Sequence, residues 1–387
     1  MKDTTMSDTP ERAARLAEEK MKPKIRLADA RPPEFSDEAL AHHLVERNAD
    51  GLCYVAAWRQ WYAWTGSQWE MDTTLDVFDK ARAVCRAAAS EADKPHIMTA
   101  LASAKTVASV ERLARSDRRV AAVAEQWDAD PDMCNAQTVT INLKTGEQYA
   151  PRPEDYCTKI MPVAPGGDCP LWRSFLNRVT NNDTELQGYL ARLVGYCLTG
   201  HTHEHALFFM HGTGANGKSV FIDTIAGMMG GYATTAPIET FLAARGDRHP
   251  TELAALRGAR LVVADETDQG RHWNEGRLKQ LTGGGDVSAR FVRQDFFTFK
   301  PTCKILIVGN HKPSIRAVDE AMSRRFHLIP FDVTIPKDER DLHLAEKLKD
   351  EWGGILQWAV DGCLAWRNEG LNPPAAVREA TDQYLVA

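Results

Sequence analysis

The stretch His211-Gly212-Thr213-Gly214-Ala215-Asn216-Gly217-Lys218-Ser219 decides the fold of this chain. It reads G-x-x-x-x-G-K-S, the pattern of a phosphate-binding loop, in which glycines let backbone N–H groups turn toward the α- and β-phosphates. In this pattern Lys218 reaches the β- and γ-phosphates, and the Ser219 hydroxyl ligates Mg²⁺. The predicted nucleotide contacts are therefore Gly212, Thr213, Gly214, Ala215, Asn216, Gly217, Lys218 and Ser219.

The residues on both sides of this loop fit the same pattern. Residues 206–210 form an apolar run typical of a buried strand, and residues 220–229 have helical spacing. The phosphates would then lie at a helix N-terminus, whose partial positive charge favours anions. We therefore predict a strand–loop–helix unit that binds ATP together with Mg²⁺.

Length and composition set wider bounds on the protein. A chain of 387 residues with 43% hydrophobic and 26% charged residues is typical of a globular protein with two or three domains. No apolar run approaches the roughly 20 residues that span a bilayer, and no apolar segment follows the N-terminal charges. We expect a cytoplasmic protein without a signal peptide. The net charge of −6 predicts that any nucleic-acid contact is local, in a groove or pore.

Cysteine and histidine residues were considered as metal ligands. The eight cysteines are scattered and include no C-x-x-C pair, so we predict buried thiols in a reducing cytosol. Residues 201–205 read H-T-H-E-H, which is compatible with a metal site or with a loop that enters the following strand. We favour the loop.

The N-terminal part predicts a polar, flexible leader over residues 1–35 and a small α+β domain over residues 36–165. Ser36 precedes an amphipathic segment, residues 37–47, as a helix cap does. Aromatic residues then cluster between Tyr54 and Trp69. Aromatic side chains can stack on single-stranded bases, but they more often form the core of a small domain, and we favour the core.

Further elements follow from periodicity and turn signals. Helical spacing predicts helices over residues 77–92 and 97–116, and turn residues predict hairpins around residues 64–69 and 138–149. Prolines and the Gly166-Gly167 pair mark a domain boundary.

The second half of the chain contains a pair of acidic residues that can act together with the phosphate-binding loop. A helical segment over residues 171–198, broken at 181–183, leads to the loop, and an apolar strand over residues 260–264 ends in Asp265-Glu266. Adjacent acids at the end of a buried strand are typical of a Walker B element. Asp265 would hold Mg²⁺ through water, and Glu266 would orient the attacking water.

A basic stretch follows, against the trend of the chain. Residues 287–299 read as a hairpin that carries Arg290 and Arg293. Nearby lysines and arginines indicate a phosphodiester partner, although a solvated hairpin explains them equally well.

Two later sites complete the set. The strand over residues 304–308 leads to Asn310, which can orient water near a γ-phosphate or serve only as a turn residue. Arg324-Arg325 precede the apolar strand 326–331. Such a pair is usually surface charge, but in a ring ATPase it can reach a neighbour's γ-phosphate, where it is worth about 10³–10⁵ in rate.

In this order, the elements resemble those of the superfamily 3 helicases, above all the phage and poxvirus primase-helicase group. The similarity extends from about residue 36 to the C-terminus. Residues 309–313 and 324–331 match the phage members in type and spacing. The corresponding motifs are Gly212 to Ser219 for Walker A, Asp265-Glu266 for Walker B, residues 279–293 for B′ and Asn310 for motif C.

The resemblance implies an α/β, AAA+-like P-loop NTPase core with a helical collar over residues 166–335, and C-terminal helices over residues 336–387 that pack on the collar. It also implies a homo-oligomeric ring, usually a hexamer, with ATP between subunits. No primase motif of the archaeo-eukaryotic type is visible, so we expect no primer synthesis. Relatives often continue into a winged-helix domain, which this sequence does not include, so origin or fork binding by such a domain is left open here.

The resemblance also implies roles for the remaining basic residues. Arg325, with Arg324 beside it, would complete the ATP site of a neighbouring subunit, and Lys279 would be a further positive contact on the phosphates. The hairpin would point Arg290 and Arg293 into the central channel, where Arg293 would grip one DNA strand by its backbone.

These expectations lead to a function. We predict an ATP-dependent, ring-forming DNA helicase of a phage or prophage replication module. It would act on single-stranded or forked DNA together with other replication proteins, and we expect no membrane partner. The alternative is an ATP-dependent loading or assembly protein that binds DNA without unwinding it. A small-molecule kinase is a third candidate, which the basic hairpin and the arginine pair disfavour.

Overall fold

The computed structural model describes residues 31–243, 251–265, 271–290, 296–314 and 319–386. Most of the predicted leader lies outside these residues, as do Glu266 and Arg293. The chain forms two compact units. The first comprises Met1–Trp61 and Asp72–Ala122, and the second comprises Tyr62–Met71 and Val123–Ala387.

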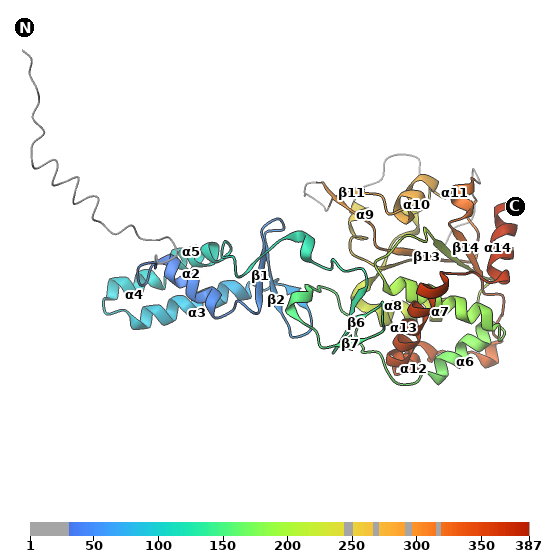
Figure 1. Ribbon diagram of the computed structural model, residues 1–387, viewed down its shortest axis with the longest axis horizontal. Helices are drawn as coiled ribbons and strands as arrows, with labels where there is room; N and C mark the ends of the chain where they lie inside the picture. The colour runs from blue at the N-terminus through green and yellow to red at the C-terminus, as the bar shows by residue number, and fades with distance from the viewer. Residues whose placement is uncertain (1–30, 244–250, 266–270, 291–295, 315–318, 387) are drawn as a thin grey trace, which may run out of the picture. The chain divides into compact units, whose positions relative to one another are not determined.

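The first unit is mainly helical (Figure 1). Its elements are α2 (Asp37–Glu46), α3 (Asp76–Glu91), α4 (Pro95–Leu101), α5 (Ala104–Ala114) and the parallel pair β1 (Leu52–Val55) and β4 (Ala121–Ala122). Ser36 caps α2 as predicted, accepting a hydrogen bond from Ala39 N at 3.2 Å. The single helix predicted over residues 97–116 is instead two helices, because Ser103 is extended and caps α5 through Thr106 N.

The predicted hairpins are confirmed in the second unit. Strand β2 (Gln60–Trp64) pairs with β3 (Trp69–Met71), and β6 (Thr140–Asn142) pairs with β7 (Gln148–Tyr149), both antiparallel. A further strand, β5 (Met133–Asn135), pairs with β6 and was not predicted.

A five-stranded parallel sheet forms the centre of the second unit. Its order is β14–β8–β13–β10–β9, so β13 lies between the strand that enters the phosphate-binding loop and the strand that ends in Asp265. The strands are β8 (Leu207–His211), β9 (Ala233–Thr235), β10 (Leu261–Asp265), β13 (Lys304–Gly309) and β14 (Phe326–Pro330). All except β9 were predicted, and β9 falls in a stretch that the sequence left irregular.

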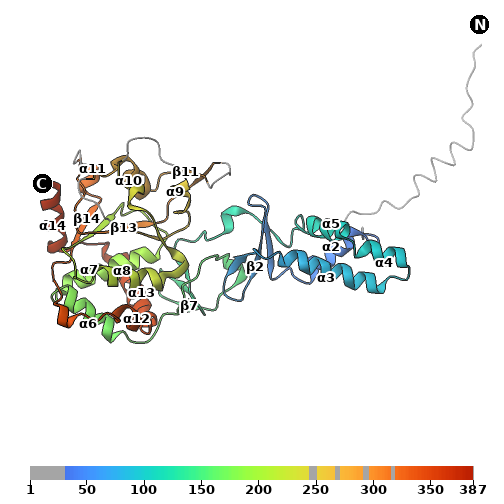
Figure 2. The same cartoon turned by 180° about the vertical axis from the view of Figure 1, so that it is seen from behind.

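Both faces of the sheet are covered, as expected of a parallel sheet (Figures 1 and 2). On β8, Phe208 and Met210 face one core, and Leu207 and Phe209 face the other. The helices on the first face are α6 (Pro170–Val179), α7 (Thr184–Leu198), α8 (Lys218–Met229), α12 (Leu344–Lys349) and α13 (Trp352–Glu369). The second face carries α9 (Thr251–Ala254), α10 (Glu275–Thr282), β11 (Val287–Ala289), β12 (Phe297–Phe299) and the short α11 (Glu320–Ser323).

Helices α7 and α13 pack closely, as the predicted collar requires, and glycines explain how. A Cβ atom at Gly195 would lie 2.1 Å from Cys363 N, and one at Gly362 would lie 2.1 Å from Ala191 O. Only glycine permits this approach of the two backbones.

Two features differ from the predicted domain organisation. Cys134 and Ile141, on β5 and β6, are buried in the same core as α7 and α13, so the second unit begins well before the predicted boundary near residue 165. The last helix, α14 (Ala375–Val386), packs along the edge strand β14 rather than on the collar. It covers backbone groups of that edge, because Thr381 Oγ1 accepts a hydrogen bond from Leu328 N at 2.9 Å.

All eight cysteines are buried and unpaired, as predicted. Among the described residues, no helix is both long enough and apolar enough to cross a bilayer. Short 3-10 turns lie at Ala124–Gln126, Pro153–Asp155, Gly230–Tyr232, Ile238–Thr240 and Lys337–Glu339.

Candidate nucleotide-binding site

The loop between β8 and α8 has the backbone of a phosphate cradle. Gly214, Ala215 and Gly217 all have positive φ, at 107°, 50° and 86°. Within the described part of the chain, the amides of residues 213–217 donate no hydrogen bond, and α8 begins directly afterwards at Lys218. Free amides beside a helix N-terminus fit a phosphate group, so these residues suit a bound nucleotide.

The loop is held in this shape by the segment that follows β14. Asn216 Nδ2 donates to Phe331 O at 2.8 Å, and Ile335 N donates to Ala215 O at 2.8 Å. A Cβ atom at Gly212 would lie 2.0 Å from Asn216 Nδ2 and 2.3 Å from Phe331 O. The backbone therefore approaches its neighbours too closely for any side chain at position 212, and the cradle is formed in advance.

The structure brings two predicted residues together at this loop. The Lys218 ammonium donates to Gly212 O at 2.8 Å, to Asn216 Oδ1 at 3.0 Å and to Asn310 Oδ1 at 3.1 Å. Burial lowers the pKa of Lys218. Asn310 follows β13, whose last residue pairs with His211 on β8, so the sheet register itself places the amide beside the loop.

Carboxylates lie at the same edge of the sheet. Asp265 ends β10 and is level with Val308 on β13. Asp223, on α8, was missed by the sequence reasoning, although it follows Ser219 by one helical turn and shares its face. Partial burial and the negative charge of Asp265 raise the pKa of Asp223, so the two carboxylates influence each other. Hydroxyl and carboxylate oxygens are ligands that Mg²⁺ prefers, and Ser219 and Asp265 are both exposed.

The neighbouring histidine stays neutral. Burial, together with the positive charges of Lys312 and Lys218, lowers the pKa of His211. The positive charge at the loop therefore comes from the lysines rather than from this imidazole.

The two adjacent arginines have different surroundings. Arg325 is only 8% exposed, and its guanidinium donates to Thr282 Oγ1 at 3.3 Å and to Ala321 O at 2.6 Å. Arg324 is exposed. Arg325 is therefore engaged within its own chain, whereas Arg324 is exposed, and the role of the pair at a neighbouring subunit stays a prediction.

Lys279 lies close to this pair. On α10, it forms an ion pair with Asp319, which caps α11 by accepting a hydrogen bond from Met322 N at 2.8 Å. The described contacts place Lys279 at the start of the helix that leads to Arg324, and they do not bring it to the phosphate loop.

The basic hairpin is present, and its strands β11 and β12 pair antiparallel. Its tip, including Arg293, lies outside the described residues. Arg290 lies beside Phe296, with the guanidinium carbon 4.9 Å from the ring centroid, and Phe296 is 60% exposed. The sequence reasoning missed Phe296, although an aromatic residue next to the basic tip was the available signal.

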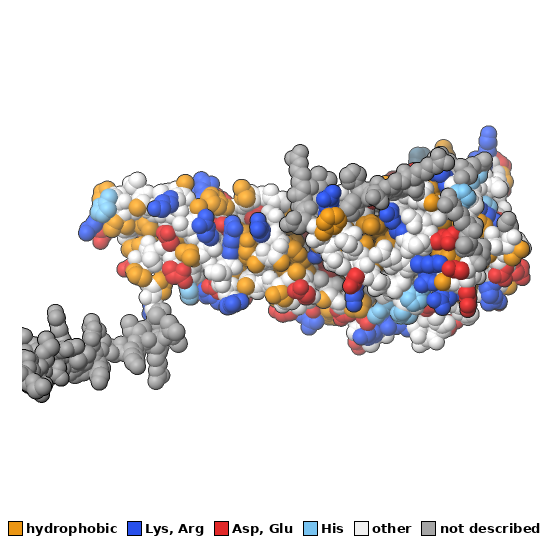
Figure 3. Space-filling model, turned by 90° about the horizontal axis from the view of Figure 1, so that it is seen from above, with side chains coloured by type: hydrophobic (Ala, Val, Ile, Leu, Met, Phe, Trp, Pro, Cys, Tyr) orange, Lys and Arg blue, Asp and Glu red, His pale blue; other side chains and the backbone are white. Residues whose placement is uncertain are grey.

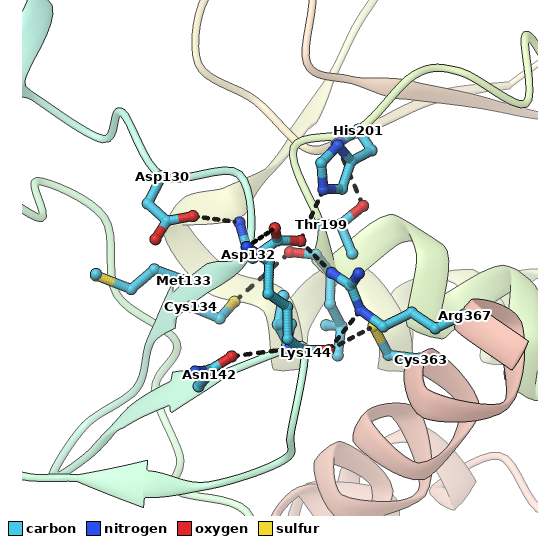
Figure 4. A network of polar contacts seen from close by, with 12 residues as sticks. Asp130, Asp132, Met133, Cys134, Asn142, Lys144, Thr199, His201, Cys363 and Arg367 are labelled. Atoms are coloured by element: carbon cyan, nitrogen blue, oxygen red, sulfur yellow. Dashed lines mark hydrogen bonds and ion pairs between the residues drawn. The ribbon is translucent and has the colours of Figure 1, made fainter.

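The histidine-rich segment forms a structural network (Figure 4). Asp132 is bonded to His201 Nε2 at 2.7 Å, to Lys144 Nζ at 3.2 Å and to Arg367. Burial alone would raise the pKa of Asp132, but hydrogen bonds from His201 and Lys144 and the charge of Arg367 lower it. No cluster of three possible metal ligands occurs among the described residues.

Three of the six aromatic residues between Tyr54 and Trp69 are buried, and the other three are partly exposed. Tyr54 and Trp61 are buried in the first unit, where Trp61 Nε1 donates to Glu111 at 2.6 Å. Trp69 is buried in the second unit. These three side chains are therefore not free to stack on bases.

Comparison with known proteins adds the family. Residues 41–181 match the family described as "D5 N terminal like", and residues 210–325 match a family of unknown function, DUF5906. A protein of Acanthamoeba polyphaga mimivirus named "Putative helicase" is 28% identical over 229 residues, covering 54% of this chain and 24% of that protein. A "Putative helicase" of Frog virus 3 is 27% identical over 292 residues, covering 69% and 28%. These matches support a primase-helicase family of the phage and poxvirus type for this chain.

Two further findings concern the fold and the length of this chain. The apo structure of the NrS-1 C-terminal region has a similar fold, with a TM-score of 0.57 at 11% identity, covering 92% of this chain and 76% of that one. The chain spans about a quarter of the length of the viral relatives. The structural match shows a shared fold.

Proposed function

We propose that the protein is an ATP-dependent, ring-forming DNA helicase that translocates along single-stranded DNA in a phage-type replication module. The observation that carries this proposal is the hydrogen bond of 3.1 Å between Lys218 Nζ and Asn310 Oδ1. It joins the phosphate-binding loop to the end of the strand that lies between the loop and Asp265. An AAA+-like ATPase of superfamily 3 needs such an arrangement.

The loop residues would bind and orient the nucleotide. The free amides of residues 213–217 and the Lys218 ammonium would hold the phosphates, and Asn310 would orient water beside them. Ser219 and Asp265 would hold Mg²⁺, which supplies Lewis-acid stabilisation of phosphate charge. Glu266, next in the chain, remains the proposed group that orients the attacking water.

The hairpin would contact DNA. Arg290 and Arg293 would pair with phosphates, and the exposed ring of Phe296 offers a surface on which a base can stack. Grip on the strand would thus combine charge with stacking.

In a ring, Arg324 would reach the ATP of the neighbouring subunit, because its side chain is exposed while that of Arg325 is bonded within its own chain. Lys279 would hold the helix before Arg324 through Asp319. A direct phosphate contact by Lys279 would require that ion pair to break.

The test is steady-state ATP hydrolysis with and without an oligothymidylate, followed by unwinding of a forked duplex. We expect DNA to stimulate hydrolysis and strand separation to depend on ATP, while Lys218→Ala lowers turnover by about 10²-fold or more. Hydrolysis that DNA does not stimulate would contradict the proposal. DNA-stimulated hydrolysis without strand separation would favour the loading-protein alternative.

A further inference from the structure

The C-terminal helix α14 lies against more than the sheet edge. Its Tyr384 ring lies 5.0 Å from the Phe326 ring on β14, measured between centroids, and the Lys312 ammonium lies 5.9 Å from the Tyr384 centroid. Lys312 belongs to the segment that follows β13 and Asn310. The helix thus contacts the first residue of β14 and the segment that follows β13.

The Tyr384 hydroxyl makes two hydrogen bonds in opposite roles. It donates to Pro313 O, and it accepts from Trp273 Nε1 at 2.9 Å. Pro313 follows β13, and Trp273 lies on the path from β10 to α10. One hydroxyl therefore bridges the segment that follows Asn310, after β13, and the segment that follows β10, which ends at Asp265.

These two segments are also bonded to each other. Trp273 N donates to Ser314 O at 3.2 Å, Ser314 N donates to Arg271 O at 2.9 Å, and Ser314 Oγ lies 2.6 Å from His272 Nδ1. Trp273 is only 2% exposed. The bridge is therefore a packed unit, which can transmit a displacement.

The path from this unit to the nucleotide loop is short. Pro313 is three residues after Asn310, and the proline restricts its own backbone and that of Lys312. Asn310 Oδ1 in turn accepts the hydrogen bond from Lys218. A shift of α14 at Tyr384 would therefore move the amide that faces the phosphate site.

We propose that Tyr384 is a positioning residue that holds the Asn310 segment, and that docking of α14 is linked to occupation of the nucleotide site. This inference rests on the proposed ATPase function. Because such coupling is reciprocal, a nucleotide that fixes Asn310 also strengthens the docking of α14.

The first test is the variant Tyr384→Phe, which removes the hydroxyl and keeps the ring against Phe326. A lost hydrogen bond of ordinary strength predicts a kcat lowered about 3- to 10-fold with KM for ATP nearly unchanged. Because Trp273 Nε1 and Pro313 O lose their partner, the melting temperature should also fall by a few degrees. The matched control is Tyr149→Phe on β7, which should retain wild-type kcat. A Tyr384→Phe enzyme with wild-type kcat would overturn the positioning role.

The second test follows hydrogen exchange of residues 375–386 in the wild-type chain, with and without a non-hydrolysable ATP analogue. We expect at least 3-fold slower exchange with the analogue, and no such slowing in Asn310→Ala. Equal exchange in the wild type, although the analogue binds, would refute the linkage and leave the ATPase proposal standing. Failure of the wild type to bind the analogue would refute both.

Discussion

At the scale of single residues, the sequence alone does not distinguish Arg324 from Arg325, because both precede the same strand. The structure separates them through α10. Thr282 and Ala321 accept the hydrogen bonds of Arg325, and burial together with the charge of Arg324 lowers the pKa of Arg325. One arginine therefore serves the packing of its own chain, and the other remains available to a neighbour.

The different surroundings of Arg324 and Arg325 predict different effects of their alanine variants on stability. Arg325→Ala removes the donor to Ala321 O and one of the two hydrogen bonds of the buried Thr282 hydroxyl, which still donates to Leu278 O. It should therefore lower the free energy of unfolding by about 1–3 kcal/mol. Arg324→Ala changes an exposed side chain and should stay within about 0.5 kcal/mol of wild type. Urea denaturation of both variants measures the difference. Equal stabilities would show that Arg325 is not structurally engaged.

His327 on β14 predicts a pH dependence of stability. Burial lowers its pKa to about 4, and its Nδ1 atom lies 2.9 Å from the Tyr189 hydroxyl. The unfolded chain, with an ordinary pKa near ~6.5, binds this proton more readily, so stability falls as the pH drops from about 6.5 to about 4. Between pH 7 and pH 5 the loss should be about 2 kcal/mol.

Chemical denaturation at the two pH values tests this prediction. The variant His327→Asn keeps a hydrogen-bond acceptor for Tyr189 and removes the titration, so its stability should change less between pH 7 and pH 5. The exposed His96→Asn should behave like wild type. A wild-type pH dependence in His327→Asn would assign the effect to another group.

At the scale of elements, the network around Asp132 joins three parts of the second unit. Lys144 belongs to the β6–β7 turn, His201 to the segment before β8, and Arg367 to α13. A single carboxylate therefore ties the small antiparallel sheet to the helical layer. The sequence did not predict this network, because its residues lie far apart in the chain.

Removing that carboxylate should loosen the junction. Asp132→Asn removes the carboxylate that Lys144, His201 and Arg367 share. Because these side chains remain partly exposed, the cost should be about 2–3 kcal/mol of unfolding free energy. Asp361→Asn, an exposed change on the same helix as Arg367, should cost less than about 0.5 kcal/mol. Urea denaturation compares the two. An equally small loss at Asp132 would contradict the role of the network.

The hairpin predicts how DNA is gripped. If Phe296 stacks on a base, Phe296→Ala should weaken binding of oligothymidylate about 10-fold without changing its salt dependence. Arg290→Ala should instead lower the slope of log K against log salt by about 0.7. Fluorescence anisotropy at several salt concentrations measures both quantities.

An abasic oligonucleotide supplies the control for the hairpin. Phe296→Ala should bind it as tightly as wild type does, because no base is present to stack. Leu342→Ala, which truncates a side chain that is 88% exposed elsewhere, should leave binding to both oligonucleotides unchanged. Loss of abasic binding in Phe296→Ala would indicate a disturbed hairpin rather than lost stacking.

The elements that the sequence predicted are those with a strong local signal. The phosphate loop, the helices on either side of the break at residues 181–183 and four of the five central strands follow from glycine pattern, periodicity and apolar runs. Strand β9 has only three residues, and its pairing with β10 is a long-range contact. The placement of α14 and the burial of Arg325 depend on tertiary packing, which a local pattern does not contain.

The candidate site was predictable for a related reason. Lys218, Asp265 and Asn310 each follow a strand of one parallel sheet, and the carboxyl ends of such strands meet at one edge. The sequence did not identify Asp223 or Tyr384, because both occupy ordinary helix positions and their roles depend on the residues they contact in the folded chain. Glu266 and Arg293 lie outside the described residues, and their roles stay predictions.

At the scale of the whole molecule, charge is distributed rather than concentrated. Figure 3 shows acidic and basic side chains interspersed on one face, in keeping with the net charge of −6. A net negative charge does not attract nucleic acid over long distances, so the proposed DNA binding would have to come from local groups. A ring would supply one hairpin per subunit around the same strand.

The ring hypothesis makes its strongest prediction for mixed subunits. In Arg324→Ala the nucleotide loop is intact and the arginine offered to the neighbour is missing, so the pure variant should bind ATP and hydrolyse it about 10³-fold more slowly. In Lys218→Ala the arginine offered to the neighbour is intact and the nucleotide loop is defective. When the two inactive variants are mixed at random in equal amounts, roughly one interface in four combines an intact loop with an intact arginine, so turnover should recover to that order.

Mass measurement with ATP and single-stranded DNA must show that the mixture assembles. If it assembles without regaining turnover, Arg324 does not act across an interface. If mixing Arg325→Ala with Lys218→Ala restores turnover and the Arg324 mixture does not, the exposed arginine is the wrong choice. Recovery only in the Arg324 mixture would mean that the buried Arg325 stabilises its own chain and that the exposed Arg324 contacts the next subunit.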